Sequence, residues 1–237
     1  LSAAEDERKR SDAARREFLA AIGHDLRTPL AALQAAVEGG AETLVLCDTN
    51  GGATPWEVEE ITRRVTDQFG EATQIGIHAH NDSELGVANS LAGIKGGAVH
   101  VQGTINGYGE RCGNANLCAI LPDLELKMGK RTLPEGQLTQ MYEVAHFVAE
   151  VANLAADEHM AYVGRSAFAH KGGIHVAAIR RNIDSYQHID PELVGNQMRV
   201  VVSELSGRGN LMSKAEEFGL DVESGPEVAG VLKESKE

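Results

Sequence analysis

The stretch that decides the fold is residues 74–82, which read QIGIHAHND. Its first half is a short apolar run of the kind that forms a buried strand. Side chains two positions apart on a strand point to the same face, so His78 and His80 can converge on one divalent cation. The alternative is that they are two polar residues at the end of a strand. We interpret the stretch as a strand that ends in a metal site.

A glycine-rich loop, residues 107–115 with the sequence GYGERCGNA, follows a second apolar strand at residues 99–103. Glycine lets the backbone of a loop approach a ligand closely. In the same loop Glu110 and Arg111 supply an acid and a base that can position a substrate and balance its charge. An ordinary surface loop with an ion pair is the alternative interpretation.

Strands and helices alternate around these two motifs. Strands are predicted at residues 43–47, 75–80 and 99–103, with helices at 55–69 and 84–95 between them. Such alternation predicts parallel βαβ units, in which ligands lie beyond the carboxyl ends of the strands. Asp48, His78, His80 and Glu110 all fall at or just after those ends.

The remaining segments are mainly helical in pattern. Helical spacing of apolar residues covers residues 2–37, residues 134–158 predict one long amphipathic helix, and 200–220 predict a small helical region. The three expected domains are an N-terminal helix at 1–36, a partial barrel at 37–130 and a mostly helical linker subdomain at 131–237.

Composition excludes several classes of partner. A formal charge of −13 would repel nucleic acid and anionic membrane surfaces, and no apolar run approaches the ~18 residues of a membrane span. The three cysteines, Cys47, Cys112 and Cys118, form no Cys-x-x-Cys pair, which favours reduced thiols. A cytoplasmic protein without nucleic-acid or membrane partners is expected.

From about residue 30 onward the chain resembles the citramalate synthase and 2-isopropylmalate synthase family, whose members condense acetyl-CoA on a (β/α)8 barrel. The resemblance rests on five motifs in the family's order. The GERCGNA sequence is more similar to citramalate synthases than to isopropylmalate synthases. The motifs are LCDTNGG at 46–52, HAHND at 78–82, GYGERCGNA at 107–115, HKGGIH at 170–175, and residues 186–196.

The resemblance implies an α/β fold, a 2-keto acid substrate such as pyruvate, and acetyl-CoA as co-substrate in isoleucine and leucine biosynthesis. It implies a divalent metal, Mg or Mn, where ligand type alone would favour Mn or Zn. The implied metal ligands are His78, His80 and Asn114. The implied catalytic residues are His175, Tyr186 and Glu110, with Arg111, Asp48 and Thr49 binding substrate. Tyr186 would act across a homodimer, although Asp48 and Thr49 equally fit a turn cap.

An eight-stranded barrel takes about 250 residues, yet the barrel-like part covers only about residues 41–130. The first-strand Asp-Gly-x-x-Arg-Asp-Gly string of the family is not in this sequence, nor is a regulatory domain. We therefore expect a partial (β/α)8 barrel with little or no activity as this 237-residue chain.

Residues 15–30, RREFLAAIGHDLRTPL, instead resemble the phosphoacceptor helix of a sensor histidine kinase, in which His24 would take the phosphate. No ATP-binding domain follows, so an inert helical histidine or a dimerisation helix is the alternative. Two further hypotheses are a metal-dependent lyase or aldolase, which would not need His175 and Tyr186, and a non-functional chimera of two genes.

Overall fold

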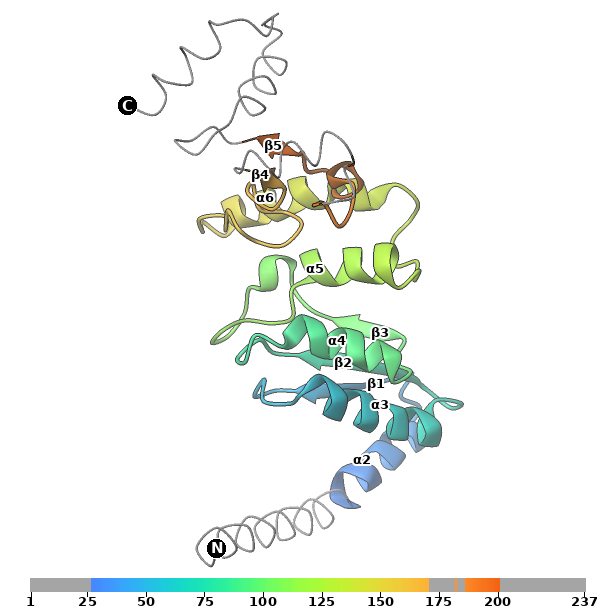
Figure 1. The fold of residues 1–237 in the computed structure, drawn as a ribbon. Helices are drawn as coiled ribbons and strands as arrows, with labels where there is room; N and C mark the ends of the chain where they lie inside the picture. Colours follow the sequence, from blue (N-terminus) through green and yellow to red (C-terminus); the bar gives the residue numbers. More distant parts are fainter. Residues whose placement is uncertain (1–26, 171–181, 183–185, 201–237) are drawn as a thin grey trace, which may run out of the picture. The chain divides into compact units, whose positions relative to one another are not determined.

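The computed structural model describes residues 27–170, 182 and 186–200 (Figure 1). Contacts divide the chain into two compact units. The first comprises Leu1–His78 and Ala88–Gln102, and the second Ala79–Val87 and Gly103–Glu237. The domain boundaries expected from the sequence, after residues 36 and 130, stay predictions.

A three-stranded sheet organises the first unit. Its strands are β1 (Thr43–Asp48), β2 (Gln74–Ala79) and β3 (His100–Gln102), in the order β1-β2-β3. β2 and β3 pair in parallel, with Gly76 opposite His100 and His78 opposite Gln102. The three predicted strands are therefore confirmed, and strand order that follows chain order is the pattern of a barrel segment.

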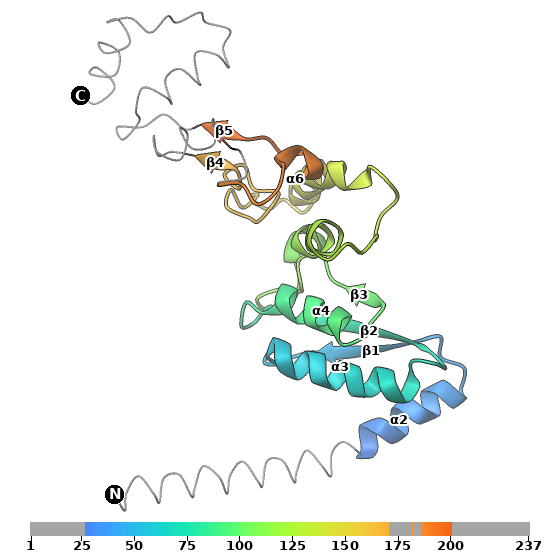
Figure 2. The same cartoon turned by 45° about the vertical axis from the view of Figure 1, so that its right-hand side comes forward.

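Helices α3 (Pro55–Phe69) and α4 (Gly86–Lys95) lie on the same face of this sheet (Figures 1 and 2). α3 begins where the sequence predicts, because the Glu57 carboxylate accepts hydrogen bonds from the Thr54 backbone N–H (2.9 Å) and hydroxyl (2.6 Å). α4 packs close to the sheet. A Cβ built at Gly93 would lie only 3.0 Å from the Ile77 side chain, so glycine permits this approach.

Two apolar clusters hold these layers together. Leu44, Val65, Phe69 and Ile75 form one, and Leu33, Ala36 and Val37 from α2 (Arg27–Glu38) pack against it. Val58, Ile77, Ala92 and Ala98 form the other. Because Ile75 and Ile77 point to the helix-covered face, His78 and Gly76 point to the opposite one.

Short helices and loops build the second unit. In chain order these are η1 (Ile105–Gly107), α5 (Leu117–Pro122), η2 (Asp123–Lys127), η3 (Gln137–Gln140), α6 (Met141–Val151), β4 (Ala169–His170), η5 (Pro191–Val194) and β5 (Arg199–Val200). β4 and β5 pair in parallel. The core of this unit gathers Cys118, Leu138, Met141, Tyr162 and Val194.

The long helix predicted at residues 134–158 is shorter than expected. Gly136, with φ +80°, precedes the 3-10 turn η3, so the α-helix begins only at Met141. α6 ends at Val151, and Asn153 adopts a left-handed φ of +54°. A left-handed residue ends an α-helix, and neither turn is encoded in apolar spacing.

The architecture is a partial (β/α)8 fold, as the sequence predicts. All three cysteines are free thiols in the structure. Among helices of the described residues, none combines the length and apolar character that a membrane span requires. The helical region predicted at 200–220, and residues 1–26 with His24, lie outside the described residues.

Candidate active site

His78 is the last residue of β2 that belongs to the first unit. It takes part in a series of hydrogen bonds across the sheet. Its Nδ1 lies 3.1 Å from Gln102 Oε1, and Gln102 Nε2 lies 3.3 Å from His100 Nε2. An amide oxygen only accepts, so Nδ1 of His78 carries the proton. Nε2 of a neutral imidazole in this tautomer bears the lone pair that a metal requires.

Asp48, at the end of β1, is held by α4 in the same unit. Its Oδ2 accepts a 3.2 Å hydrogen bond from Asn89 Nδ2, which also donates to the Ala53 carbonyl oxygen at 2.9 Å. Asn89 is completely buried. This hydrogen bond ties the Asp48 carboxylate to α4. Thr49, which the sequence also predicts to bind substrate, is exposed.

The second unit brings His80 and Asn114 together. They pair as an isolated antiparallel bridge, flanked by hydrogen bonds from Asn81 N to Gly113 O and from Ala115 N to Ala79 O, both 2.9 Å. Residues opposite each other in such a bridge present their side chains on the same face. Asn114 Nδ2 donates to the Tyr108 carbonyl oxygen (3.3 Å), which orients its amide oxygen as the acceptor.

Glycines make this loop fit. Gly113 has a φ of +94°, and a Cβ built on it would overlap the Gly107 carbonyl oxygen, which itself accepts a hydrogen bond from Asn114 N (3.0 Å). A Cβ on Gly109 would overlap the Asn114 side-chain amide. These close approaches explain why the loop needs glycine at both positions.

Arg111 closes the loop over the HAHND motif. Its guanidinium binds Asp82 at two points, Nε to Oδ1 at 2.7 Å and NH2 to Oδ2 at 3.0 Å, and NH2 lies 3.1 Å from His80 Nδ1. A guanidinium only donates, so Nδ1 of His80 accepts and Nε2 carries the proton. A cation that binds His80 must therefore displace either this proton or the Arg111 contact.

The Arg111 ion pair sets the charge state of its partner. The hydrogen bond from Arg111 holds the pKa of the Asp82 carboxyl below its usual value, and Asp82 in turn raises the pKa of Arg111. We expect Arg111→Gln to raise the pKa of Asp82 toward the ordinary aspartate value, because the charged partner is gone.

Carboxyl-carbon NMR followed against pH measures this change directly. Glu57 is the internal control, since its pKa is lowered by the Thr54 hydroxyl hydrogen bond and should not move. An Asp82 titration that is the same in both proteins would show that the two side chains do not pair in solution.

The other predicted residues differ in how they are placed. Glu110 is 81% exposed, with its carboxylate 3.9 Å from Arg111 NH1. Tyr186 is exposed at 47%. His175 and His24 lie outside the described residues. The structure thus brings His80, Arg111 and Asn114 together with Asp82 in one unit, and His78 with Gln102 in the other.

The donor set fits a divalent cation in its chemistry. Two imidazoles and one amide oxygen suit Mn or Zn by ligand type, and Mg by its oxygen. Within the described part of the chain no three His, Cys, Asp or Glu side chains cluster as a metal site. That finding leaves the predicted set open, since it contains only two such residues and an asparagine.

Two functional candidates escaped the sequence reasoning. Asp82 is the last residue of the HAHND motif, and the structure makes it the anchor of Arg111. Gln102 orients His78 from the neighbouring strand. Its signal in the sequence was a polar residue at the end of an apolar strand, directly before a glycine.

A parallel βαβ sheet with polar side chains at its strand ends defines the class, an α/β barrel-type enzyme fold. The chain belongs to the HMGL-like family: residues 4–148 match the family model. Residues 162–237 match the homocitrate synthase post-HMGL domain-like model.

The chain is similar to two kinds of synthase in sequence and to a lyase in structure. The chain is 52% identical over 209 residues to an (R)-citramalate synthase of Aquifex aeolicus, covering 88% of this chain and 39% of that protein. It is 35% identical over 189 residues to a 2-isopropylmalate synthase of Saccharolobus solfataricus, covering 80% and 48%. An HMG-CoA lyase structure from Bacillus subtilis has 27% identity and a TM-score of 0.46, covering 52% of this chain and 42% of that one.

These matches bear on the alternatives. The chain spans about two fifths of the length of the citramalate synthases it matches. The HMGL-like match begins at residue 4 and includes all of residues 15–30, the segment that resembles a kinase phosphoacceptor helix. Nothing in the matches supports a phosphoacceptor role for His24 or the joining of two genes.

Proposed function

We propose that this chain is part of a citramalate synthase-type acyltransferase that condenses acetyl-CoA with a 2-keto acid, pyruvate, in branched-chain amino-acid biosynthesis. The observation that carries the proposal is the 52% identity to an (R)-citramalate synthase, compared with 35% and 39% to two 2-isopropylmalate synthases. The matched region includes the HAHND strand end and the GERCGNA loop.

The residues proposed to hold the cation are His78, His80 and Asn114. His78 is already in the tautomer with a lone pair on Nε2. The Nδ2 of Asn114 is hydrogen-bonded to Tyr108, which leaves its Oδ1 as the atom that would face the cation. A bound Mg or Mn ion would polarise the keto oxygen and fix the orientation of the keto acid.

Arg111 and Glu110 are proposed as the substrate residues of the loop. Arg111 is fully charged and can exchange its contact with His80 for the carboxylate of a keto acid, while Asp82 keeps the guanidinium in place. Glu110 is the exposed carboxylate beside it. Asp48 and Thr49 remain weaker candidates, because Asp48 is already bound to Asn89.

His175 and Tyr186 are proposed as the catalytic residues of the C-terminal part. His175 would take the methyl proton of acetyl-CoA on a ring nitrogen, which requires an approach of about 3 Å. Tyr186 would reach the site of a partner subunit in a homodimer. Its exposed side chain is consistent with a contact outside its own chain.

Manganese binding tests the proposal. We expect the 237-residue chain to bind one Mn ion in a titration followed by electron paramagnetic resonance of the free ion. The double variant His78→Ala with His80→Ala should lose at least tenfold in affinity, because it removes both imidazole ligands. Pyruvate added to the Mn-loaded chain should change the spectrum of the bound ion.

His159→Ala is the matched control, because it removes a histidine that lies in an exposed turn. It should bind Mn as tightly as the unchanged chain. Equal Mn affinity in the double variant would refute the metal site and with it the synthase chemistry of this strand end.

A further inference from the structure

A second polar pocket lies in the second unit, built by residues to which the proposed chemistry assigns no role. Its cavity of about 410 Å³ is lined by Tyr142, Arg165, Gly195, Asn196, Gln197 and Arg199. This volume falls within the range of small-molecule sites. Among the described residues, the lining contains two guanidinium groups and no carboxylate, in a chain whose formal net charge is −13.

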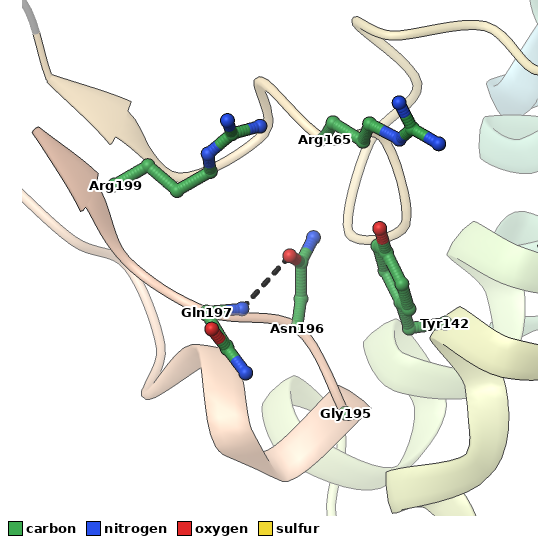
Figure 3. A pocket seen from close by; sticks show the side chains of 6 residues that line it. All are labelled: Tyr142, Arg165, Gly195, Asn196, Gln197 and Arg199. Atoms are coloured by element: carbon green, nitrogen blue, oxygen red, sulfur yellow. Dashed lines mark hydrogen bonds between the residues drawn. The ribbon is translucent and has the colours of Figure 1, made fainter. Parts of the chain in front are cut away.

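The two arginines come from separate segments (Figure 3). Arg199 extends from β5 and Arg165 from the loop above Tyr142, whose hydroxyl is directed at that loop. Arg199 makes no ion pair with any described residue. Within the described part of the chain Arg165 pairs with Glu158, with Nε and Oε1 at 3.8 Å and both side chains about half exposed. Such a long, exposed pair contributes little, so both cations are available to a ligand.

The backbone beneath the arginines is fixed by a buried amide. Asn196 is 6% exposed, and its Nδ2 donates to the carbonyl oxygens of Tyr162 (2.9 Å) and Gly164 (3.0 Å). Its Oδ1 accepts from Gln197 N at 2.8 Å, the contact drawn in Figure 3. Asn196 therefore ties the turn that leads to Arg199 to the loop that carries Arg165.

Two further contacts hold the same frame. Arg199 N donates to the Phe168 carbonyl oxygen at 3.0 Å, and β5 pairs with β4 at this position. A Cβ on Gly195 would overlap the Thr139 carbonyl oxygen, so the turn packs tightly against η3. The backbone positions from which Arg165 and Arg199 extend are therefore fixed.

We infer that this pocket binds the phosphate groups of a nucleotide-type ligand. Guanidinium groups offer paired N–H donors that match the oxygens of phosphate, and the Tyr142 hydroxyl and Gln197 amide add neutral hydrogen-bonding groups. A strongly acidic chain needs such local cations to hold an anion. Resting on the proposed function, we assign the phosphates to the 3′-phosphate and diphosphate of coenzyme A.

Calorimetric titration of the full chain with coenzyme A, dephospho-CoA and adenosine 3′,5′-bisphosphate tests the assignment. Arg165→Gln and Arg199→Gln should each weaken coenzyme A binding on the order of tenfold, the loss of a charge-assisted contact. Both side chains are exposed, so folding should persist, and far-UV circular dichroism checks this.

Two matched variants make the test sharper. Arg131→Gln removes the same charge from an exposed position outside the pocket and should leave binding unchanged. Glu158→Gln removes the carboxylate that competes for Arg165 and should tighten binding by about two- to threefold. A general charge effect would instead make Arg131→Gln as damaging as the pocket variants.

The outcomes separate this inference from the proposed function. Unchanged coenzyme A binding in both pocket variants overturns the inference and leaves the synthase proposal standing. Binding of adenosine 3′,5′-bisphosphate that depends on both arginines, without binding of acetyl-CoA, supports the pocket and contradicts the proposed function. Inorganic phosphate that binds as tightly as coenzyme A would overturn the assignment to coenzyme A.

Discussion

Gly113→Ala is expected to destabilise the second unit by about 2–5 kcal/mol. A non-glycine residue at a left-handed φ costs about 1–2 kcal/mol, and Gly113 has a φ of +94°. The new methyl group would also overlap the Gly107 carbonyl oxygen, and relieving such crowding adds about 1–3 kcal/mol. Urea unfolding followed by circular dichroism measures the loss.

Gly129→Ala is the matched control for this change. Gly129 also has a positive φ, +63°, but no atom lies within 4 Å of a Cβ built there. It should cost only about 1–2 kcal/mol, the conformational part alone. If both variants lost equal stability, the steric conflict inside the loop would be absent in solution.

Gly113→Ala should also damage the proposed metal site. The Gly113 carbonyl oxygen accepts from Asn81 N, and Gly107 O accepts from Asn114 N, so shifting either group disturbs the bridge between His80 and Asn114. We expect Mn affinity to fall at least tenfold in Gly113→Ala and to be unchanged in Gly129→Ala.

Ile75→Ala should destabilise the first unit by about 2–5 kcal/mol. Ile75 is 2% exposed and packs with Leu44, Val65 and Phe69. Truncating a buried isoleucine removes the transfer free energy of its methyl groups and leaves a cavity that packed neighbours fill only in part. With a urea dependence of about 1.5 kcal/mol per molar, the midpoint should fall by about 1–3 M.

Ile61→Ala provides the comparison, because Ile61 lies on α3 and is 51% exposed. The chemical change is identical, while the burial is different. Its midpoint should shift by less than about 0.5 M, as expected for a surface substitution. An equal shift in the two variants would mean that the apolar cluster around Ile75 does not form.

Local pattern was sufficient for the elements of the first unit. The apolar run that includes Ile75 and Ile77 predicts β2 as a buried strand, and the Thr54 and Glu57 pair fixes the start of α3. The residues involved are neighbours in the chain, so the interactions that determine them are visible in sequence spacing. The prediction of a parallel sheet followed from these elements.

Local pattern failed where a single backbone angle decides the outcome. The predicted helix at 134–158 was too long because apolar spacing does not reveal that Gly136 and Asn153 take left-handed angles. The role of Asp82 could not be predicted for a different reason. Its partner Arg111 is 29 residues away, and only the folded loop brings the two side chains together.

The sequence by itself determined the strand–helix repeat, the chemistry available at the strand ends and the family. These depend on residue type and on short spacings. Tertiary structure alone decided which groups meet: Arg111 with Asp82 and His80, His78 with Gln102, and Arg165 with Arg199 around one pocket. Such contacts join distant positions, and their geometry is set by the packing of whole elements.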